Sequence, residues 1–162
     1  MYPDARRLRG HTSAVEQGRP YAVRYDIALD DRWRTREVRV SSDTVEGERS
    51  TVLLSDGEGH WAVDGVDASH LDGLVDVDLE ASVCTNTLPL HRLSLPVGEE
   101  VLAAAVYVRA LDLSVTRLDQ TYRRRDDRTF DYVSEDGAFR ALLEYDAAGL
   151  IVDYPGIAVR FA

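Results

Sequence analysis

The chain has 162 residues, a formal net charge of −10 and 44% hydrophobic residues, enough to bury the core of one domain. The acidic balance argues against nucleic acid as a partner, because binding to phosphates depends on a basic surface. All 19 basic residues are arginine, so chemistry that depends on a lysine, such as a Schiff base or a phosphate-binding loop, is excluded.

Alternation of hydrophobic and polar residues predicts strands in the first half of the chain. The segment YAVRYDIAL places its large hydrophobic side chains on one strand face: Tyr21, Val23, Tyr25, Ile27 and Leu29. TREVRV and RSTVLLS predict two further strands. The residues DGEG predict a tight turn before a short strand that contains Trp61.

The segment LVDVDL alternates in the same way and carries two carboxylates. Val75, Val77 and Leu79 share one face, and Asp76 and Asp78 share the other. In a sheet that is covered on one side, the polar face points to solvent, so we expect both aspartates to be exposed. If that face is instead the inner one, the carboxylates need donors such as arginines.

Strand patterns continue in the second half of the chain. EVLAAAVYV predicts a strand buried on both faces, and the charged loop RRRDD predicts a hairpin end between LDLSVTRLDQTY and RTFDYVS. AFRALLEYD, LIVDY and IAVRF predict the last strands. These patterns indicate an all-β, mainly antiparallel fold. About ten strands must curl to cover their edges, so we expect a single curled sheet that forms a spiral roll or barrel-like body with little helix.

We expect one domain over residues 1–162, in which residues 1–18 form a loosely ordered N-terminal segment. No apolar run is long enough to cross a bilayer, and MYPDARRLRGHTS lacks the apolar core of a signal peptide. A cytoplasmic location is therefore expected. Whether a homo-oligomer covers the strand edges stays open.

Cys84, the single cysteine, and His91 raise the question of nucleophilic catalysis. A cysteine nucleophile needs a base within hydrogen-bond reach. Seven residues separate Cys84 from His91, with Pro89 between them, and this spacing is typical of no nucleophile motif. We interpret Cys84 as a small buried hydrophobic residue.

Metal binding and glycoside hydrolysis are two other chemistries that the residue types allow. His60 and His70 with nearby aspartates could ligate a metal, but their spacing is not that of a metal motif, so we expect no metal site and no cofactor. Asp76 and Asp78 would lie about 6–7 Å apart on one strand face, a separation compatible with the carboxylate pairs of glycosidases. The alternative, which we favour, is a solvated polar face.

Polar side chains in TNTLP and QTY are candidates for ligand contacts. Asn86 lies between two threonines in a predicted polar turn, and Arg92 could clamp a carboxylate through two parallel hydrogen bonds. A structural pair between Arg92 and an aspartate is an equal alternative. Gln120 and Tyr122 share a strand face and could bind sugar hydroxyls, or Tyr122 could be a core tyrosine with a satisfied hydroxyl.

Four ordered segments resemble the bacterial family of putative glycolipid-binding proteins: LDGLVDVDLEASVCTNTLPLHRLSL, VYVRALDLSVTRLDQTYRR, FDYVSEDG and GLIVDYPGIAVRF. The resemblance implies a single spiral β-roll, similar to periplasmic carriers of lipoprotein acyl chains, without established catalytic residues. An arginine commonly stands in the family where this chain has His91, which argues against His91 as an obligatory base. The positions that match the family motifs are Asp76, Asp78, Asn86, Thr87, Pro89, Arg92, Gln120, Tyr122, Asp153, Tyr154 and Pro155.

From these observations we expect a non-enzymatic protein that holds an amphiphile, a glycolipid or fatty acyl compound, in an apolar cavity with polar residues at its mouth. The expected ligand-binding residues are Asp76, Asp78, Asn86, Thr87, Arg92, Gln120 and Tyr122. The expected apolar lining is Val75, Val77, Leu79, Val106, Leu143 and Tyr145. One alternative is a hydrolase of small esters or glycosides that uses Asp76, Asp78 or His91. The other is a structural roll in which the motif residues only stabilise the fold.

Overall fold

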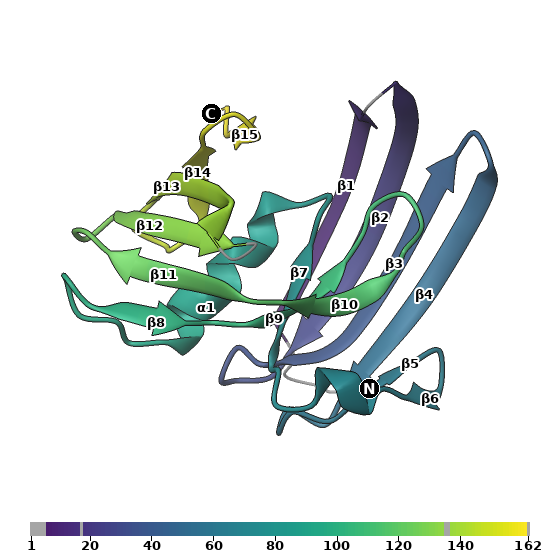
Figure 1. Cartoon of the computed structure of the whole chain (residues 1–162), viewed down its shortest axis with the longest axis horizontal. Coiled ribbons are helices and arrows are strands. Elements are labelled where there is room, and N and C mark those ends of the chain that lie inside the picture. The colour runs from purple at the N-terminus through teal and green to yellow at the C-terminus, as the bar shows by residue number, and fades with distance from the viewer. Residues whose placement is uncertain (1–5, 17, 135–136, 162) are drawn as a thin grey trace.

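The computed structural model describes residues 6–16, 18–134 and 137–161. Strands of these residues form three sheets, in which every described pair but one is antiparallel. The predicted all-β, mainly antiparallel class is therefore confirmed. The strands are divided among the three sheets instead of following one curled sheet, and the sheets are not closed into a barrel (Figure 1).

The first sheet, the meander sheet, contains six strands in chain order: β1 (Arg6–Glu16), β2 (Arg19–Leu29), β3 (Thr35–Thr44), β4 (Gly47–Ser55), β5 (Trp61–Val63) and β6 (Val66–Asp67). Consecutive hairpins join its long strands, as the alternation predicts. Residues 6–16 differ from the expected loosely ordered segment, because β1 pairs with β2 along its whole length, from Arg6 opposite Leu29 to Glu16 opposite Arg19. Residues 1–5 and 17 lie outside the described residues.

The other two sheets share one long bent hairpin. The central sheet has the order β10 (Val115–Leu118), β9 (Ala105–Val108), β7 (Asp76–Leu79). The C-terminal sheet has the order β15 (Ala158–Val159), β14 (Ile151–Tyr154), β13 (Phe139–Tyr145), β12 (Thr129–Ser134), β11 (Gln120–Arg124), β8 (Glu100–Leu102). EVLAAAVYV, expected as one strand, thus bends at Ala103 and Ala104 and passes from one sheet to the other.

The bend separates two hydrophobic cores. The first core lies between the meander sheet and the central sheet and includes Ile27, Val38, Leu53, Trp61 and Val106. The second core lies on the C-terminal sheet and is rich in aromatic residues: Tyr122, Phe130, Tyr132, Tyr145 and Tyr154, with Leu143. Ala103 belongs to the second core, whereas Val106 belongs to the first, which explains why the chain changes direction between them.

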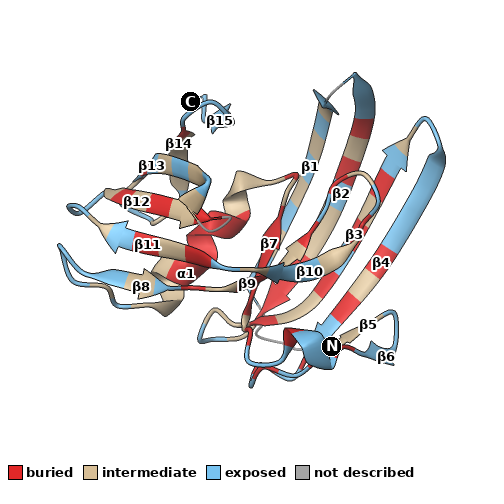
Figure 2. Ribbon diagram, in the orientation of Figure 1, coloured by how far each residue is buried: buried red, intermediate tan, exposed pale blue. Residues whose placement is uncertain are grey.

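Strand β7 corrects the expectation that Asp76 and Asp78 are exposed. All four residues of β7 are buried, although the predicted alternation holds (Figure 2). Val77 and Leu79 face the first core, and the two aspartates contact the short helices that follow β7. Because β7 is paired in parallel with β9 and covered on both faces, neither face is solvated.

The short helices are η1 (Ser69–Leu71), η2 (Val83–Asn86) and α1 (Thr87–Arg92). The residues TNTLP, expected as a polar turn, therefore form the junction of η2 and α1. Among the described residues, no helix has the length and apolar character needed to cross a membrane.

Candidate functional site

Arg92, on the last turn of α1, pairs with Asp76 of β7. Its Nε and Nη2 atoms lie 3.0 and 2.6 Å from the two carboxylate oxygens of Asp76, the two-pronged geometry anticipated for Arg92. The Asp76 side chain is 1% exposed. Burial raises the pKa of Asp76, while the hydrogen bonds and the charge of Arg92 act in the opposite direction. The pair fastens α1 to the central sheet.

Asp78 has a different environment from Asp76, because no arginine faces it among its described contacts. The Oγ1 atom of Thr85 in η2 donates to Asp78 Oδ1 at 2.8 Å and accepts the backbone N–H of Leu79 at 3.2 Å. Burial raises the pKa of Asp78 to about 6, and the charges of Asp76 and Glu80 act in the same direction. Asp78 is thus a buried carboxyl group whose protonation changes near neutral pH.

Asn86, the last residue of η2, connects the helices to the C-terminal sheet. Its Nδ2 donates to the Tyr122 hydroxyl at 2.9 Å, and its backbone carbonyl accepts the Tyr145 hydroxyl at 3.1 Å. On the same sheet, the Tyr132 hydroxyl donates to Gln120 Oε1 at 2.7 Å. Gln120 and Tyr122 therefore share a face, as predicted, and both are buried in a hydrogen-bonded network.

The position of η2 also depends on Gly10 and Tyr25 of the meander sheet. The Tyr25 hydroxyl lies 2.8 Å from Ser82 Oγ, and the same Oγ accepts the backbone N–H of Cys84 at the start of η2. The Tyr25 ring covers Gly10, where a Cβ atom would clash with it. Glycine at position 10 thus leaves room for the Tyr25 ring, and Tyr25 connects the meander sheet to the start of η2 through Ser82.

A cleft of about 480 Å³ opens between the ends of β1 and β2 and the C-terminal sheet. We call it the tyrosine cleft and define it by Tyr21, Asp78, Asn86, Tyr107, Tyr132 and Tyr154. Among the described residues, no donor reaches the second carboxylate oxygen of Asp78 or the side-chain oxygen of Asn86. The floor of the cleft therefore presents acceptors and aromatic rings.

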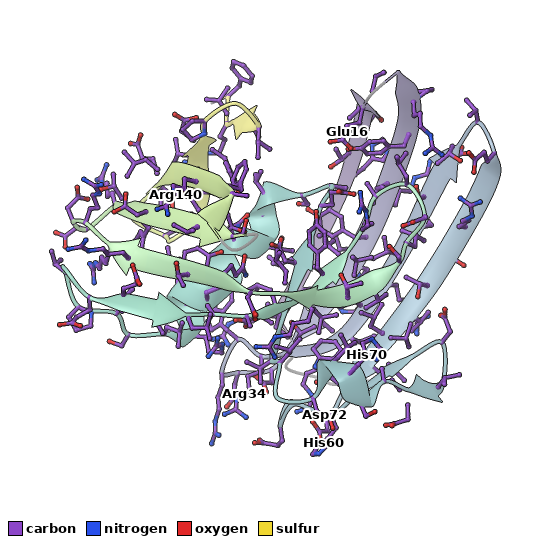
Figure 3. The ribbon with its side chains drawn as sticks, viewed as in Figure 1. Glu16, Arg34, His60, His70, Asp72 and Arg140 are labelled. Carbon is purple, nitrogen blue, oxygen red and sulfur yellow. The ribbon has the colours of Figure 1, made fainter. Side chains whose placement is uncertain are left out.

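The rim of the tyrosine cleft carries two large aliphatic side chains that are exposed to solvent. Val15 on β1 is 70% exposed, and Ile157 after β14 is 54% exposed; both line the cleft. Figure 3 shows Glu16, another lining residue, at the end of β1 that faces the cleft. Buried polar groups thus lie in the interior together with Leu79, and exposed aliphatic residues lie at the edge together with Glu16. This arrangement differs from the expected apolar cavity with a polar mouth.

The expected site residues divide among several places. Asp78 and Asn86 line the tyrosine cleft, and Tyr122 lines a different cavity, beside α1. Asp76, Thr87, Arg92 and Gln120 line neither, and Thr87 is fully buried. Of the expected apolar lining, Val77, Leu79 and Val106 pack in the first core, Leu143 and Tyr145 pack in the second, and Val75 is half-buried.

Sequence reasoning missed Tyr107, Tyr132 and Ser134 as lining residues of the cleft. The signal was present in TFDYVS, because Phe130, Tyr132 and Ser134 alternate and are all buried on one face of β12. Tyr107 gave no comparable signal, since it lies in a segment that is hydrophobic at almost every position.

The cysteine and the histidines are not among the lining residues of this cleft. Burial raises the pKa of the Cys84 thiol, which disfavours the thiolate, and no described hydrogen bond joins Cys84 to His91. The His91 ring stacks on Trp33, with centroids 3.8 Å apart. His60 bonds Asp56 at 2.7 Å, at the end of the meander sheet opposite Glu16 (Figure 3). The described residues contain no group of three or more potential metal ligands.

The chain is similar to a known protein family and to a solved structure. The model of the family described as "Putative glycolipid-binding" matches residues 2–160. The crystal structure of a DUF1089 family protein from Pseudomonas aeruginosa is 31% identical in sequence and has a TM-score of 0.87 to this chain. The alignment covers 99% of this chain and 94% of that chain. The search of curated proteins found no match.

Proposed function

The chain belongs to the family of putative glycolipid-binding proteins, and from this premise we propose that it binds a glycolipid in the tyrosine cleft without breaking a bond. The sugar occupies the polar floor, and the hydrocarbon chain leaves over the exposed aliphatic side chains of the rim. The observation that carries the proposal is the contrast between a floor of acceptors and tyrosine rings and a rim of exposed aliphatic side chains.

The floor has the chemistry that a sugar requires. Sugar hydroxyls donate hydrogen bonds, and the free oxygens of Asp78 and Asn86 can accept them. The rings of Tyr107, Tyr132 and Tyr154 supply rigid, amphipathic surfaces of the kind that binding sites use to orient a ligand. The cleft volume, about 480 Å³, is within the ordinary range for small ligands, roughly 300–1,000 Å³.

The rim suits the hydrocarbon part. Val15 on β1 and Ile157 in the turn between β14 and β15 are large hydrophobic residues that the fold leaves exposed at the edge of one cleft. An alkyl chain lying between them would gain ~0.8 kcal/mol for each methylene removed from water.

Calorimetric titration with dodecyl maltoside below its micellar concentration tests the proposal. We expect saturable binding that Val15→Asp weakens at least several-fold. Val66→Asp is the matched control, because Val66 is 69% exposed on the same sheet but does not line the cleft, and it should bind as the unmodified chain does. No saturable binding, or equal losses in the two variants, would overturn the proposal.

A second candidate, glycoside hydrolysis, is favoured by one observation. Asp78 is a carboxyl group in a cleft, and burial raises its pKa to about 6, the property of a general acid. Of the other two residues in the hydrolase alternative, Asp76 is neutralised by Arg92 and His91 stacks on Trp33. Turnover of a chromogenic glycoside, abolished by Asp78→Asn, would support hydrolysis, and a panel without turnover would rule against it.

A further inference from the structure

A second cavity, of about 560 Å³, lies beside α1. We call it the leucine cavity. Four half-buried aliphatic side chains and two buried aromatic rings form much of its wall: Leu90, Leu93, Leu95, Val101, Phe130 and Tyr145. Half-buried aliphatic side chains that converge on one hollow leave apolar surface for a ligand to cover.

One of the charged side chains that line the leucine cavity, an arginine, has no ion-pair partner among the described residues. Arg124 donates to the Leu95 carbonyl at 2.9 Å and pairs with Asp127 at 3.1 Å. Asp146 pairs with Arg160 at 2.7 Å. Arg128 also lines the cavity, is exposed, and has no hydrogen-bond or ion-pair partner for its guanidinium among the described residues. The Arg128 guanidinium is therefore available to an anionic group of a ligand in this cavity.

A buried wall separates the leucine cavity from the tyrosine cleft. Tyr122 and Tyr145 line the leucine cavity, and both bond to Asn86, which lines the cleft. Since Tyr122 and Asn86 are 1% and 4% exposed, the wall is closed by packed side chains. A ligand in one cavity therefore does not extend directly into the other.

We propose that the leucine cavity binds a single-chain fatty acid, with the hydrocarbon against Leu90, Leu93 and Leu95 and the carboxylate on Arg128. The proposal is independent of glycolipid binding in the tyrosine cleft, because it uses neither Asp78 nor the rim of that cleft. A guanidinium binds a carboxylate through charge-assisted, two-pronged hydrogen bonds, so the acid group decides the orientation of the chain. The volume of about 560 Å³ is that of a site for one small ligand.

Calorimetric titration of the full chain with sodium laurate tests whether the Arg128 guanidinium binds the carboxylate of the fatty acid. We expect saturable binding that Arg128→Ala weakens about tenfold, the loss of a charge-assisted hydrogen bond. Arg140→Ala is the matched control, because Arg140 is an exposed arginine on β13 that does not line the cavity (Figure 3). Absence of saturable binding, or the same loss in both variants, would overturn the proposal.

Substitutions of two neighbouring alanines test whether laurate binds in the leucine cavity. Ala147 lines the leucine cavity and Ala148 does not, although both are exposed. Ala147→Trp should fill the cavity and abolish laurate binding, while Ala148→Trp should leave it unchanged. Val15→Asp separates the two proposals, since it should weaken dodecyl maltoside and leave laurate unaffected. Laurate binding that responds to Val15→Asp and not to Ala147→Trp would place the fatty acid in the tyrosine cleft and refute this site.

Discussion

Replacement of Asp78 by asparagine should stabilise the protein at neutral pH. Asp78 is 8% exposed, and its described side-chain donor is the neutral hydroxyl of Thr85. A charged carboxylate in this position has lost most of its hydration without gaining a cationic partner. Asparagine keeps the size of the side chain and the oxygen that Thr85 bonds, so the substitution removes the charge and little else.

The size and the pH dependence of the effect follow from the pKa of Asp78, which burial raises from 3.8 to about 6. Each tenfold change in proton affinity is worth ~1.4 kcal/mol, so ionisation of Asp78 lowers the free energy of unfolding by ~3 kcal/mol. Below pH 3.8 Asp78 is protonated in both the folded and the unfolded chain, so it does not lower the free energy of unfolding. Between pH 3.8 and about pH 6 only the unfolded chain releases the proton, so the free energy of unfolding falls as the pH rises. This loss of stability is complete above about pH 6.

Urea unfolding of the unmodified chain and of Asp78→Asn, at about pH 3.5 and about pH 7.5, measures this difference. We expect a gain of up to ~3 kcal/mol at the higher pH and almost none at the lower. Asp112→Asn is the contrasting control, because hydrogen bonds from Ser114 lower the pKa of Asp112 and its substitution should cost stability at neutral pH. A gain of equal size at both pH values, or a loss at neutral pH, would refute the reasoning.

Two further substitutions test the contacts around η2 and α1. Arg92→Ala leaves the carboxylate of Asp76 buried without its partner and should cost ~3–5 kcal/mol in urea unfolding at neutral pH, with partial recovery in Arg92→Lys. Tyr122→Phe leaves the amide group of Asn86 without an acceptor and should cost ~1–3 kcal/mol by the same measurement. An unchanged free energy of unfolding in either variant would show that the contact is not needed for the fold.

Local sequence patterns predicted much of the strand structure. The alternation in YAVRYDIAL gives β2, with Val23 and Ile27 in the first core, and the charged loop RRRDD gives the hairpin of β11 and β12. Both features depend on neighbours in sequence, because hairpin register is set by the strands and their turn. The bend at Ala103 could not be predicted from local patterns. It arises because one end of a continuous hydrophobic segment packs in the first core and the other end packs in the second core.

The candidate site was predicted in part, and the reason for the failures is physical. A period of two shows which side chains share a face, and it correctly grouped Asp76 with Asp78. It does not show whether that face is solvated, which depends on segments distant in sequence: Arg92 and Thr85 cover the aspartates from the helices that follow. The two carboxylates then differ in role, because one has a guanidinium and the other has a neutral hydroxyl.

This difference between the two aspartates also bears on the orientation of the ligand in the binding mode that we propose for the tyrosine cleft. An apolar cavity with a polar mouth admits the hydrocarbon chain first and leaves the head group in water. The tyrosine cleft has the opposite polarity, with Asp78 and Asn86 at its floor and Val15 and Ile157 at its edge. In the proposed binding mode a glycolipid enters with its sugar first, and the sugar lies in a buried environment where unpaired polar groups are penalised. If the proposal is right, we expect affinity to depend more on the head group than on the length of the hydrocarbon chain.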